Sequence, residues 1–181
     1  MSNPTGAAGV LLAAGAGTRF GMPKVLADNG DWLKRGVAAL AGGGCDDVIV
    51  VLGAAVVDVP APARAVVTQR WVDGMSASVR AGLDAAHDAG WVVLHTVDTP
   101  DIGADVVARV LAAAQDADSG LARARYRGRP GHPVAVARRH VAELASTLCG
   151  DAGARAFLGG RDDVVDVECG DLATGVDIDE R

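Results

Sequence analysis

A glycine-rich loop carrying two cations follows the first apolar run of the chain. Val10 to Ala14 is short and apolar, which is typical of a buried parallel strand, and glycines follow at positions 15, 17 and 21. Glycine lets the backbone turn tightly and brings N–H groups close to an anion. Arg19 can grip phosphate oxygens through its planar fork, and Lys24 adds a compact point charge. The segment therefore predicts a phosphate-binding loop rather than a connector with two surface cations.

Two well-known phosphate loops have other spacings. The pattern G-x-x-x-x-G-K-[ST] is absent, and Gly15-x-Gly17-x-x-x-Gly21 is one residue longer than G-x-G-x-x-G. A P-loop kinase and a dinucleotide-dependent oxidoreductase are therefore both disfavoured.

A second candidate site follows the apolar run from Trp91 to Val97, where Asp98 opens an Asp-x-Pro turn. Magnesium prefers one or two carboxylates together with substrate phosphates, so an aspartate at a strand end facing a phosphate loop is a suitable ligand. The alternative is a helix cap or a solvated turn. We expect Asp101 to cap the following helix, which leaves Asp98 free for a metal.

Two further carboxylates lie near the carboxyl end, at Asp177 and Asp179. Alternation along an extended segment places both on one face, where either could complete a metal site with Asp98. The alternative interpretation is an acidic, frayed terminus.

Two serines and a histidine are candidates for substrate contacts. Ser76 and Ser78 lie at the start of a predicted helix, where each could cap the helix, contact substrate, or do both. His132 lies between two prolines in a turn-rich stretch and either borders the acceptor or is structural. His87, His95 and His140 have no evident partner, and no Ser-His-Asp or Cys-His pattern indicates covalent catalysis.

Apolar runs rich in β-branched residues alternate with stretches of helical periodicity. The expected strands are Val10–Ala14, Asp47–Leu52, Ala63–Thr68, Trp91–Val97, Gly120–Tyr126, Pro133–Ala137 and Val164–Glu168. The expected helices are Asp31–Gly42, Ser76–Ala89, Asp101–Ala117 and Arg138–Leu148. Alternation of this kind predicts an α/β fold, a three-layer α/β/α sandwich with a mainly parallel sheet and ligands beyond the carboxyl ends of its strands.

Length and composition limit the class of protein. A chain of 181 residues with 50% hydrophobic residues is most simply one domain, residues 1–181, with its own core. A net charge of −6 argues against nucleic-acid or anionic-membrane partners. Three widely spaced cysteines suggest neither a disulfide framework nor a zinc site, and no signal peptide or membrane span is evident, so we expect a cytoplasmic protein.

The ordered motifs resemble the MobA-like nucleotidyltransferases, in particular the molybdenum cofactor cytidylyltransferases. The resemblance rests on L-A-A-G-x-G-x-R-F-G-x-P-K at Leu12 to Lys24, W-x-x-G-M-x-x-S-x-R-x-G-L at Trp71 to Leu83, D-x-P at Asp98, G-H-P at Gly131 to Pro133, G-D-x-G-A-R at Gly150 to Arg155 and V-D-I-D at Val176 to Asp179. It implies a Rossmann-like sheet of the nucleotide-diphospho-sugar transferase type. It also implies transfer of a nucleotide to the phosphate of molybdopterin with release of pyrophosphate.

The resemblance also assigns site residues. Nucleotide contacts are implied at Leu12, Ala13, Ala14, Gly15, Gly17, Arg19, Lys24 and Ser76. Lys24, Arg19 and Asp98 are the implied catalytic residues, acceptor contacts fall at His132 and Ser78, and Mg²⁺ is held by Asp98 with Asp177 or Asp179. Ala-Ala-Gly after the first strand is similar to the branch that uses CTP, whereas relatives that transfer GMP usually carry Ala-Gly-Gly there. Molybdoenzymes and their maturation factors are the implied protein partners.

Two other functions fit the same motifs. One is a nucleotidyltransferase acting on a sugar phosphate or another small phosphorylated acceptor, which acceptor screening would identify. The other is a non-catalytic nucleotide-binding protein of the same fold, which would bind nucleotide without releasing pyrophosphate.

Overall fold

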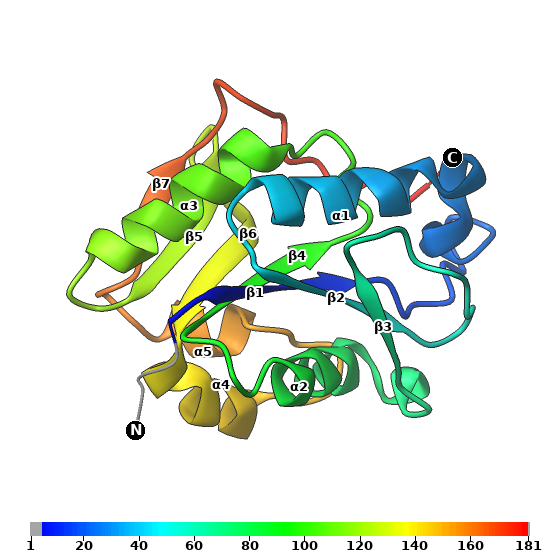
Figure 1. The fold of residues 1–181 in the computed structure, drawn as a ribbon, viewed down its shortest axis with the longest axis horizontal. Coiled ribbons are helices and arrows are strands. Elements are labelled where there is room, and N and C mark those ends of the chain that lie inside the picture. Colours follow the sequence, from blue (N-terminus) through cyan, green and yellow to red (C-terminus); the bar gives the residue numbers. More distant parts are fainter. Residues whose placement is uncertain (1–4, 181) are drawn as a thin grey trace.

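The computed structural model describes residues 5–180, which form one seven-stranded sheet with helices on both faces (Figure 1). The strands are β1 (Ala7–Leu12), β2 (Asp47–Leu52), β3 (Arg64–Val67), β4 (Trp91–Thr96), β5 (Leu121–Tyr126), β6 (Arg129–Ala137) and β7 (Val165–Glu168). The α-helices are α1 (Asp31–Gly42), α2 (Met75–Ala85), α3 (Ala104–Asp116), α4 (Val141–Thr147) and α5 (Arg155–Gly159). Short 3₁₀ helices are η1 (Lys24–Gly30), η2 (Trp71–Asp73) and η3 (Arg138–His140).

The strand order is β3-β2-β1-β4-β6-β5-β7, and every neighbouring pair is parallel except those formed by β6. The chain moves outward from β1 through β2 to β3 and then returns to place β4 on the other side of β1. A crevice therefore opens between β1 and β4 at their carboxyl ends, which is where doubly wound sheets bind ligands. The expected mainly parallel, Rossmann-like sheet is confirmed.

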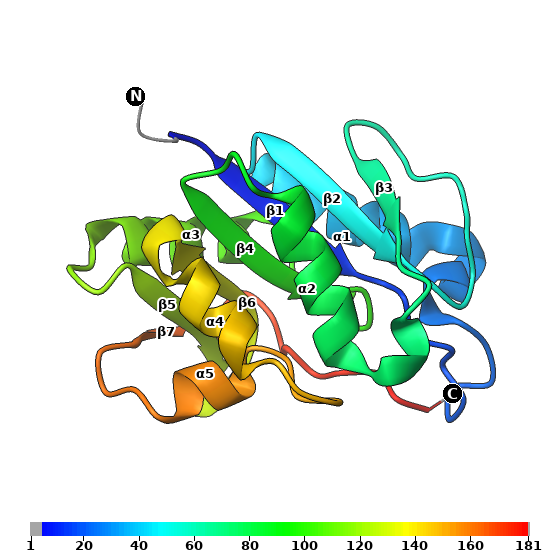
Figure 2. The same cartoon turned by 90° about the horizontal axis from the view of Figure 1, so that it is seen from below.

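Helices α1 and α3 cover one face of the sheet, and α2, α4 and α5 cover the other (Figures 1 and 2). The fully buried strand β1 lies between them. Small residues allow the close approach: a Cβ at Gly36 of α1 would lie 2.8 Å from Leu11 Cδ1, and one at Gly82 of α2 would lie 2.3 Å from Val10 Cγ1. Close packing of both helices on β1 holds the end of this strand in a fixed position.

Two expected helix caps are wrong. Helix α2 begins at Met75 after Gly74, and α3 begins at Ala104 after Gly103, with no side-chain capping bond at either start in the described chain. The Ser76 N–H instead donates to the Gly150 carbonyl at 3.0 Å. Glycine at the N-cap leaves the helix start to backbone and water partners, so the polar residues nearby are available for other contacts.

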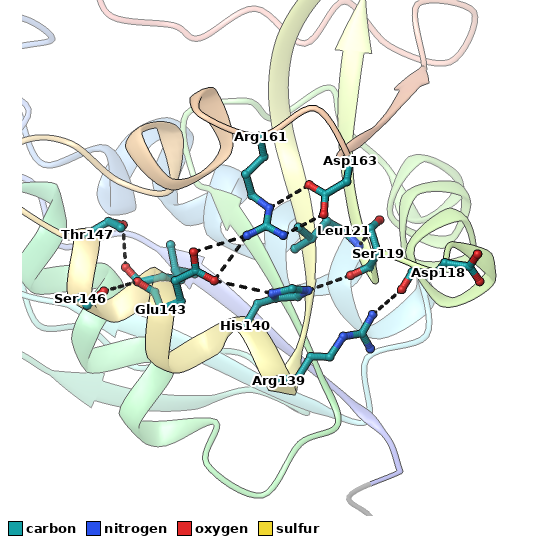
Figure 3. A network of polar contacts seen from close by, with 11 residues as sticks. Asp118, Ser119, Leu121, Arg139, His140, Glu143, Ser146, Thr147, Arg161 and Asp163 are labelled. Carbon is teal, nitrogen blue, oxygen red and sulfur yellow. Dashed lines mark hydrogen bonds and ion pairs between the residues drawn. The ribbon is translucent and has the colours of Figure 1, made fainter.

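A polar network joins α4 to neighbouring turns at the edge where the parallel strands begin, remote from their carboxyl ends (Figure 3). His140 Nε2 donates to the Ser119 carbonyl at 2.8 Å, so this histidine has a partner that sequence reasoning missed. Arg161 pairs with Asp163 at 2.8 Å and reaches Glu143 at 3.4 Å. The network ties α4 to the turns before β5 and β7.

Within residues 5–180, none of the helices has the length and apolar character needed to cross a bilayer.

Candidate functional site

The glycine-rich loop and the Asp98 turn leave the sheet side by side. β1 and β4 are parallel neighbours, and Leu12 at the end of β1 is in register with Thr96 at the end of β4. The loop after β1 closes on itself through a bond from the Gly21 N–H to the Gly17 carbonyl at 2.8 Å. Gly17 has φ +62°, and a Cβ there would lie 1.9 Å from the Met22 carbonyl oxygen, so this turn requires glycine.

A cavity of about 530 Å³ lies between this loop and the Asp98 turn. It brings together most of the nucleotide-binding and catalytic residues expected from the sequence, namely Leu12, Ala13, Gly15, Gly17, Arg19, Lys24 and Asp98, and the expected metal ligand Asp179. Ala14 is buried behind the loop, and its carbonyl accepts the Ala54 N–H at 2.9 Å. Met75 and Asp151 also line the cavity, although sequence reasoning gave neither a role.

Lys24 lies at the centre of the charged groups. Its Nζ is 2.8 Å from Asp179 Oδ1 and 3.1 Å from Asp98 Oδ2, and its side chain is 15% exposed. Burial acts to lower the pKa of Lys24, but the hydrogen bonds and charges of Asp179 and Asp98 outweigh it and the pKa is raised. The same contact lowers the pKa of Asp179. Lys24 is therefore a firmly charged cation in the lining of the cavity.

The carboxyl-terminal segment brings a further negative charge to this cluster. The Ile178 N–H donates to the Asp98 carbonyl at 3.0 Å, which brings the flanking residues Asp177 and Asp179 to the Asp98 turn. Both views place the segment beside the loop after β1 (Figures 1 and 2). Asp179 lines the first cavity, whereas Asp177 lines an adjoining one. Partial desolvation and the nearby charges of Asp98 and Asp179 raise the pKa of Asp177. Two carboxylates are thus paired with Lys24, and the charge of a third, Asp177, acts on the same cluster.

This arrangement fits a divalent cation that is completed by substrate. Within the described chain, no three His, Cys, Asp or Glu side chains form a ready-made metal site. Asp98 Oδ1, however, is buried and has no hydrogen-bond partner among residues 5–180. This carboxylate oxygen therefore has lone pairs that could bind a metal ion. Mg²⁺ and Mn²⁺ accept few protein carboxylates together with phosphate oxygens and water, so an incomplete protein site is what such an ion needs.

A second cavity, of about 390 Å³, adjoins the first and shares Leu12, Met75 and Asp151 with it. His132, which the sequence analysis predicted to contact the acceptor, lines this cavity together with Arg155 and Asp177. Burial lowers the pKa of His132, although Asp98 acts to raise it, so the imidazole is neutral near pH 7. The G-D-x-G-A-R motif contained the signal for Asp151 and Arg155, but only as part of a resemblance.

The two serines of α2 lie elsewhere. Ser76 lines a third hollow on the outer side of α2 with Thr68 and Arg80. Ser78 is 5% exposed and, among the described residues, lines none of these three cavities. Because α2 begins at Met75, this residue lies at the junction of the first two cavities in place of Ser76.

Comparison with known proteins assigns this chain to a family. Residues 9–165 match the family described as MobA-like NTP transferase domain, which spans both the glycine-rich loop and the Asp98 turn. The chain belongs to the MobA-like NTP transferase family. The coarse expectation of a nucleotidyltransferase is thereby confirmed.

Relatives of this MobA-like protein carry different names. Nicotine blue oxidoreductase of Paenarthrobacter nicotinovorans is 39% identical over 186 residues, covering 94% of this chain and 91% of that protein. Rv0371c of Mycobacterium tuberculosis H37Rv is 27% identical, with a TM-score of 0.77 over 98% of this chain and 94% of that chain. A second structure of Rv0371c is a complex with manganese, at 26% identity and a TM-score of 0.71 over 96% and 94% of the two chains.

A cytidylyltransferase is among the similar structures. The 2-C-methyl-D-erythritol 4-phosphate cytidylyltransferase of Thermus thermophilus is 25% identical, with a TM-score of 0.65 over 94% of this chain and 91% of that chain. The MobA-like protein therefore shares its fold with enzymes of nucleotidyl transfer and with a relative named as an oxidoreductase.

Proposed function

We propose that residues 1–181 act as one domain that transfers CMP from CTP to the phosphate of a small acceptor, with molybdopterin as the first candidate, and releases pyrophosphate. The observation that carries this proposal is the position of Lys24, which lines the cavity beside the glycine-rich loop and is paired there with Asp98 and Asp179. A lysine cation opposite a glycine-rich loop, with carboxylates that can hold a divalent ion, suits a triphosphate better than an uncharged ligand.

The two adjoining cavities supply the geometry for a direct transfer. The triphosphate would occupy the first cavity, with Arg19 and Lys24 on its phosphates, and the acceptor would occupy the second, beside His132. An oxygen of the acceptor phosphate forms a bond to the α-phosphorus, the bond between that phosphorus and the α,β-bridging oxygen breaks, and pyrophosphate leaves. The loop N–H groups and Lys24 offset the negative charge that develops on the phosphate oxygens. The predicted contacts of Ser76 with the nucleotide and of Ser78 with the acceptor would require the substrates to reach beyond these two cavities, which neither serine lines.

Asp98 with Asp177 or Asp179 would hold the divalent cation, for which Mg²⁺ is our proposal. When bound, such an ion neutralises phosphate charge and orients the triphosphate for in-line attack. The orphaned Asp98 Oδ1 and the crowding of carboxylates around it support this assignment. The manganese complex of Rv0371c, a protein of the same fold, also supports it.

The choice of CTP rests on two observations. Ala13-Ala14-Gly15 follows β1, as in the cytidine-using branch that the chain resembles. A structural neighbour at 25% identity is named as a cytidylyltransferase.

The test is pyrophosphate release with CTP, GTP, ATP and UTP, each with Mg²⁺ and with or without molybdenum-loaded molybdopterin. We expect release only with CTP and acceptor together. Release with a sugar phosphate in place of molybdopterin would change the acceptor assignment. Nucleotide binding without release, for a folded protein beside an active control enzyme, would contradict the proposal and favour a non-catalytic binding protein.

A second candidate function is an oxidoreductase, and one observation favours it: the relative at 39% identity is named nicotine blue oxidoreductase. The pyrophosphate of a pyridine dinucleotide could occupy the same glycine-rich loop, with its hydride donor directed towards the second cavity. Oxidation of NADH or NADPH in the presence of nicotine blue, measured in parallel with pyrophosphate, separates the two functions. Pyridine nucleotide oxidation without pyrophosphate would favour this candidate.

A further inference from the structure

The segment from Thr174 to Asp179 has no regular secondary structure, yet it is tied down close to its first residue. Asp101 Oδ2 accepts two bonds from Thr174, one from its main-chain N–H at 2.7 Å and one from its hydroxyl at 2.6 Å. Short bonds to an ionised carboxylate are among the stronger hydrogen bonds in proteins. Asp101 lies three residues after Asp98, and Thr174 lies three residues before Asp177. The pair of bonds thus joins the two acidic segments just outside the carboxylate cluster.

A second contact fixes the position of Gly175. Gly175 has φ +64°, and a Cβ there would lie 2.1 Å from Tyr126 Cδ2, so the chain turns directly against the tyrosine ring. The Tyr126 hydroxyl donates to the His132 carbonyl at 2.6 Å. The turn that begins at Thr174 therefore packs against Tyr126. The same tyrosine is hydrogen-bonded to His132, which lines the second cavity.

These contacts oppose the electrostatic repulsion among the carboxylates of the site. Asp98, Asp177 and Asp179 carry like charges that repel one another. Lys24, together with the charge of Arg19 acting on Asp179, compensates only part of that negative charge. Beyond the turn, a main-chain bond from Ile178 to Asp98 and the Lys24 ion pair of the half-exposed Asp179 hold the segment. Exposed ion pairs contribute little, so the repulsion would displace the segment unless a firmer contact held its start.

We propose that Asp101 and Thr174 are positioning residues that hold Asp177 and Asp179 beside Asp98 before the metal binds. The inference rests on the proposed function, because it concerns the metal site of that function. Groups that orient metal ligands without touching the metal typically change metal affinity by about 10- to 100-fold when they are removed.

The test uses the full chain with Thr174→Val and Asp101→Ala, and with Thr174→Ser as the variant that keeps the hydroxyl. Thr147→Val, in α4, is the matched control for the loss of a threonine hydroxyl, and Asp116→Ala, at the far end of α3, is the control for the loss of an aspartate. Two quantities are measured in each protein. One is hydrogen exchange of the Ile178 amide without metal, and the other is the Mn²⁺ dissociation constant with CTP present, from the electron paramagnetic resonance of free Mn²⁺.

We expect Thr174→Val and Asp101→Ala to speed exchange at Ile178 and to raise the Mn²⁺ dissociation constant by about tenfold, with wild-type values in Thr174→Ser and in both controls. Unchanged exchange at Ile178 would overturn the anchoring. Faster exchange with unchanged Mn²⁺ affinity would overturn the positioning role. If the wild-type protein bound no Mn²⁺ with CTP, the metal assignment of the proposed function would fall and the positioning role with it. The exchange data would still decide whether Asp101 and Thr174 hold the segment.

Discussion

The charge of Lys24 is shared between two carboxylates, with Nζ at 2.8 and 3.1 Å from Asp179 and Asp98. A lysine held by a flexible stem can exchange these partners for phosphate oxygens, because its ammonium group is a point charge with rotatable donors. The contacts with Asp98 and Asp179 therefore keep the cation in position and charged. They also leave it available for a more negative ligand.

Replacing this cation tests its role in transfer. We expect Lys24→Met to lower kcat/KM for pyrophosphate release by about 100-fold, since a preorganised charge at the reacting phosphates is lost. Lys34→Met, which removes an exposed lysine of α1, is the matched control and should keep the wild-type rate. Equal rates in Lys24→Met and the control would remove Lys24 from the catalytic machinery.

Asp177 provides a prediction about stability. The pKa of Asp177 is raised in the folded protein, so the unfolded chain loses the carboxyl proton at a lower pH than the folded protein does. The free energy of unfolding therefore falls as the pH rises from the unfolded to the folded pKa. Asp177→Asn should therefore be more stable than the wild-type protein at pH 7 without divalent cations. The difference should vanish near pH 3, where both side chains are neutral. Urea unfolding at the two pH values measures it, and a less stable variant at pH 7 would show that Asp177 is not crowded by like charge.

At the scale of elements, the loop after β1 depends on one glycine more than on the others. Gly17→Ala should lower the free energy of unfolding by at least about 2 kcal/mol, because a left-handed backbone costs about 1–2 kcal/mol for other residues and the added Cβ meets the Met22 carbonyl. Gly15→Ala is the matched control for stability, since its Cβ would have no atom within 4 Å, and it should change the unfolding free energy by less than about 0.5 kcal/mol. Chemical denaturation compares them, and similar losses in both variants would contradict the geometry of the loop.

The elements show what a sequence can and cannot predict here. Helix α1 has the expected bounds, Asp31–Gly42, because its apolar periodicity is strong and turns flank it, and the seven expected strands all occur. Ser76 and Asp101 were expected as helix caps from residue type alone. In the structure, the N-cap residues of α2 and α3 are Gly74 and Gly103. Asp101 is instead bonded to Thr174, 73 residues away, and a contact at that separation leaves no local pattern. The antiparallel direction of β6, in contrast, follows from the two-residue turn at Arg127 and Gly128 that joins it to β5, a local signal that the sequence analysis did not use.

At the scale of the whole molecule, the site is assembled from segments that lie far apart in the chain. The strand order places the loop after β1 beside Asp98, and this pairing could be expected from an α/β alternation because parallel strands end at one edge. The second cavity could not be expected in the same way. It needs Arg155, His132 and Asp177 to converge from a helix start, a hairpin and an irregular segment.

The buried core also predicts a response to acid. His95 is 1% exposed, and burial lowers its pKa to about 3, with the neighbouring His132 acting in the same direction. The unfolded chain binds this proton near pH 6.5, so stability that is complete above that pH is lost as the pH falls towards 3. Between pH 6 and 4 the unfolding free energy should fall more steeply in the wild-type protein than in His95→Leu, by about 1 kcal/mol per pH unit. Urea denaturation at several pH values measures both slopes, and equal slopes would contradict a buried neutral His95.

The measurement that tests the central claim most directly follows the phosphorus atoms of CTP. CTP labelled with ³²P at the α-position, or at the γ-position in a parallel reaction, is incubated with Mg²⁺, molybdenum-loaded molybdopterin and the protein. We predict that the α-label appears in the acceptor and the γ-label in pyrophosphate, in equal amounts, and that neither moves with Asp98→Asn. Transfer of the γ-label to the acceptor, or no movement of either label beside an active control enzyme, would contradict nucleotidyl transfer.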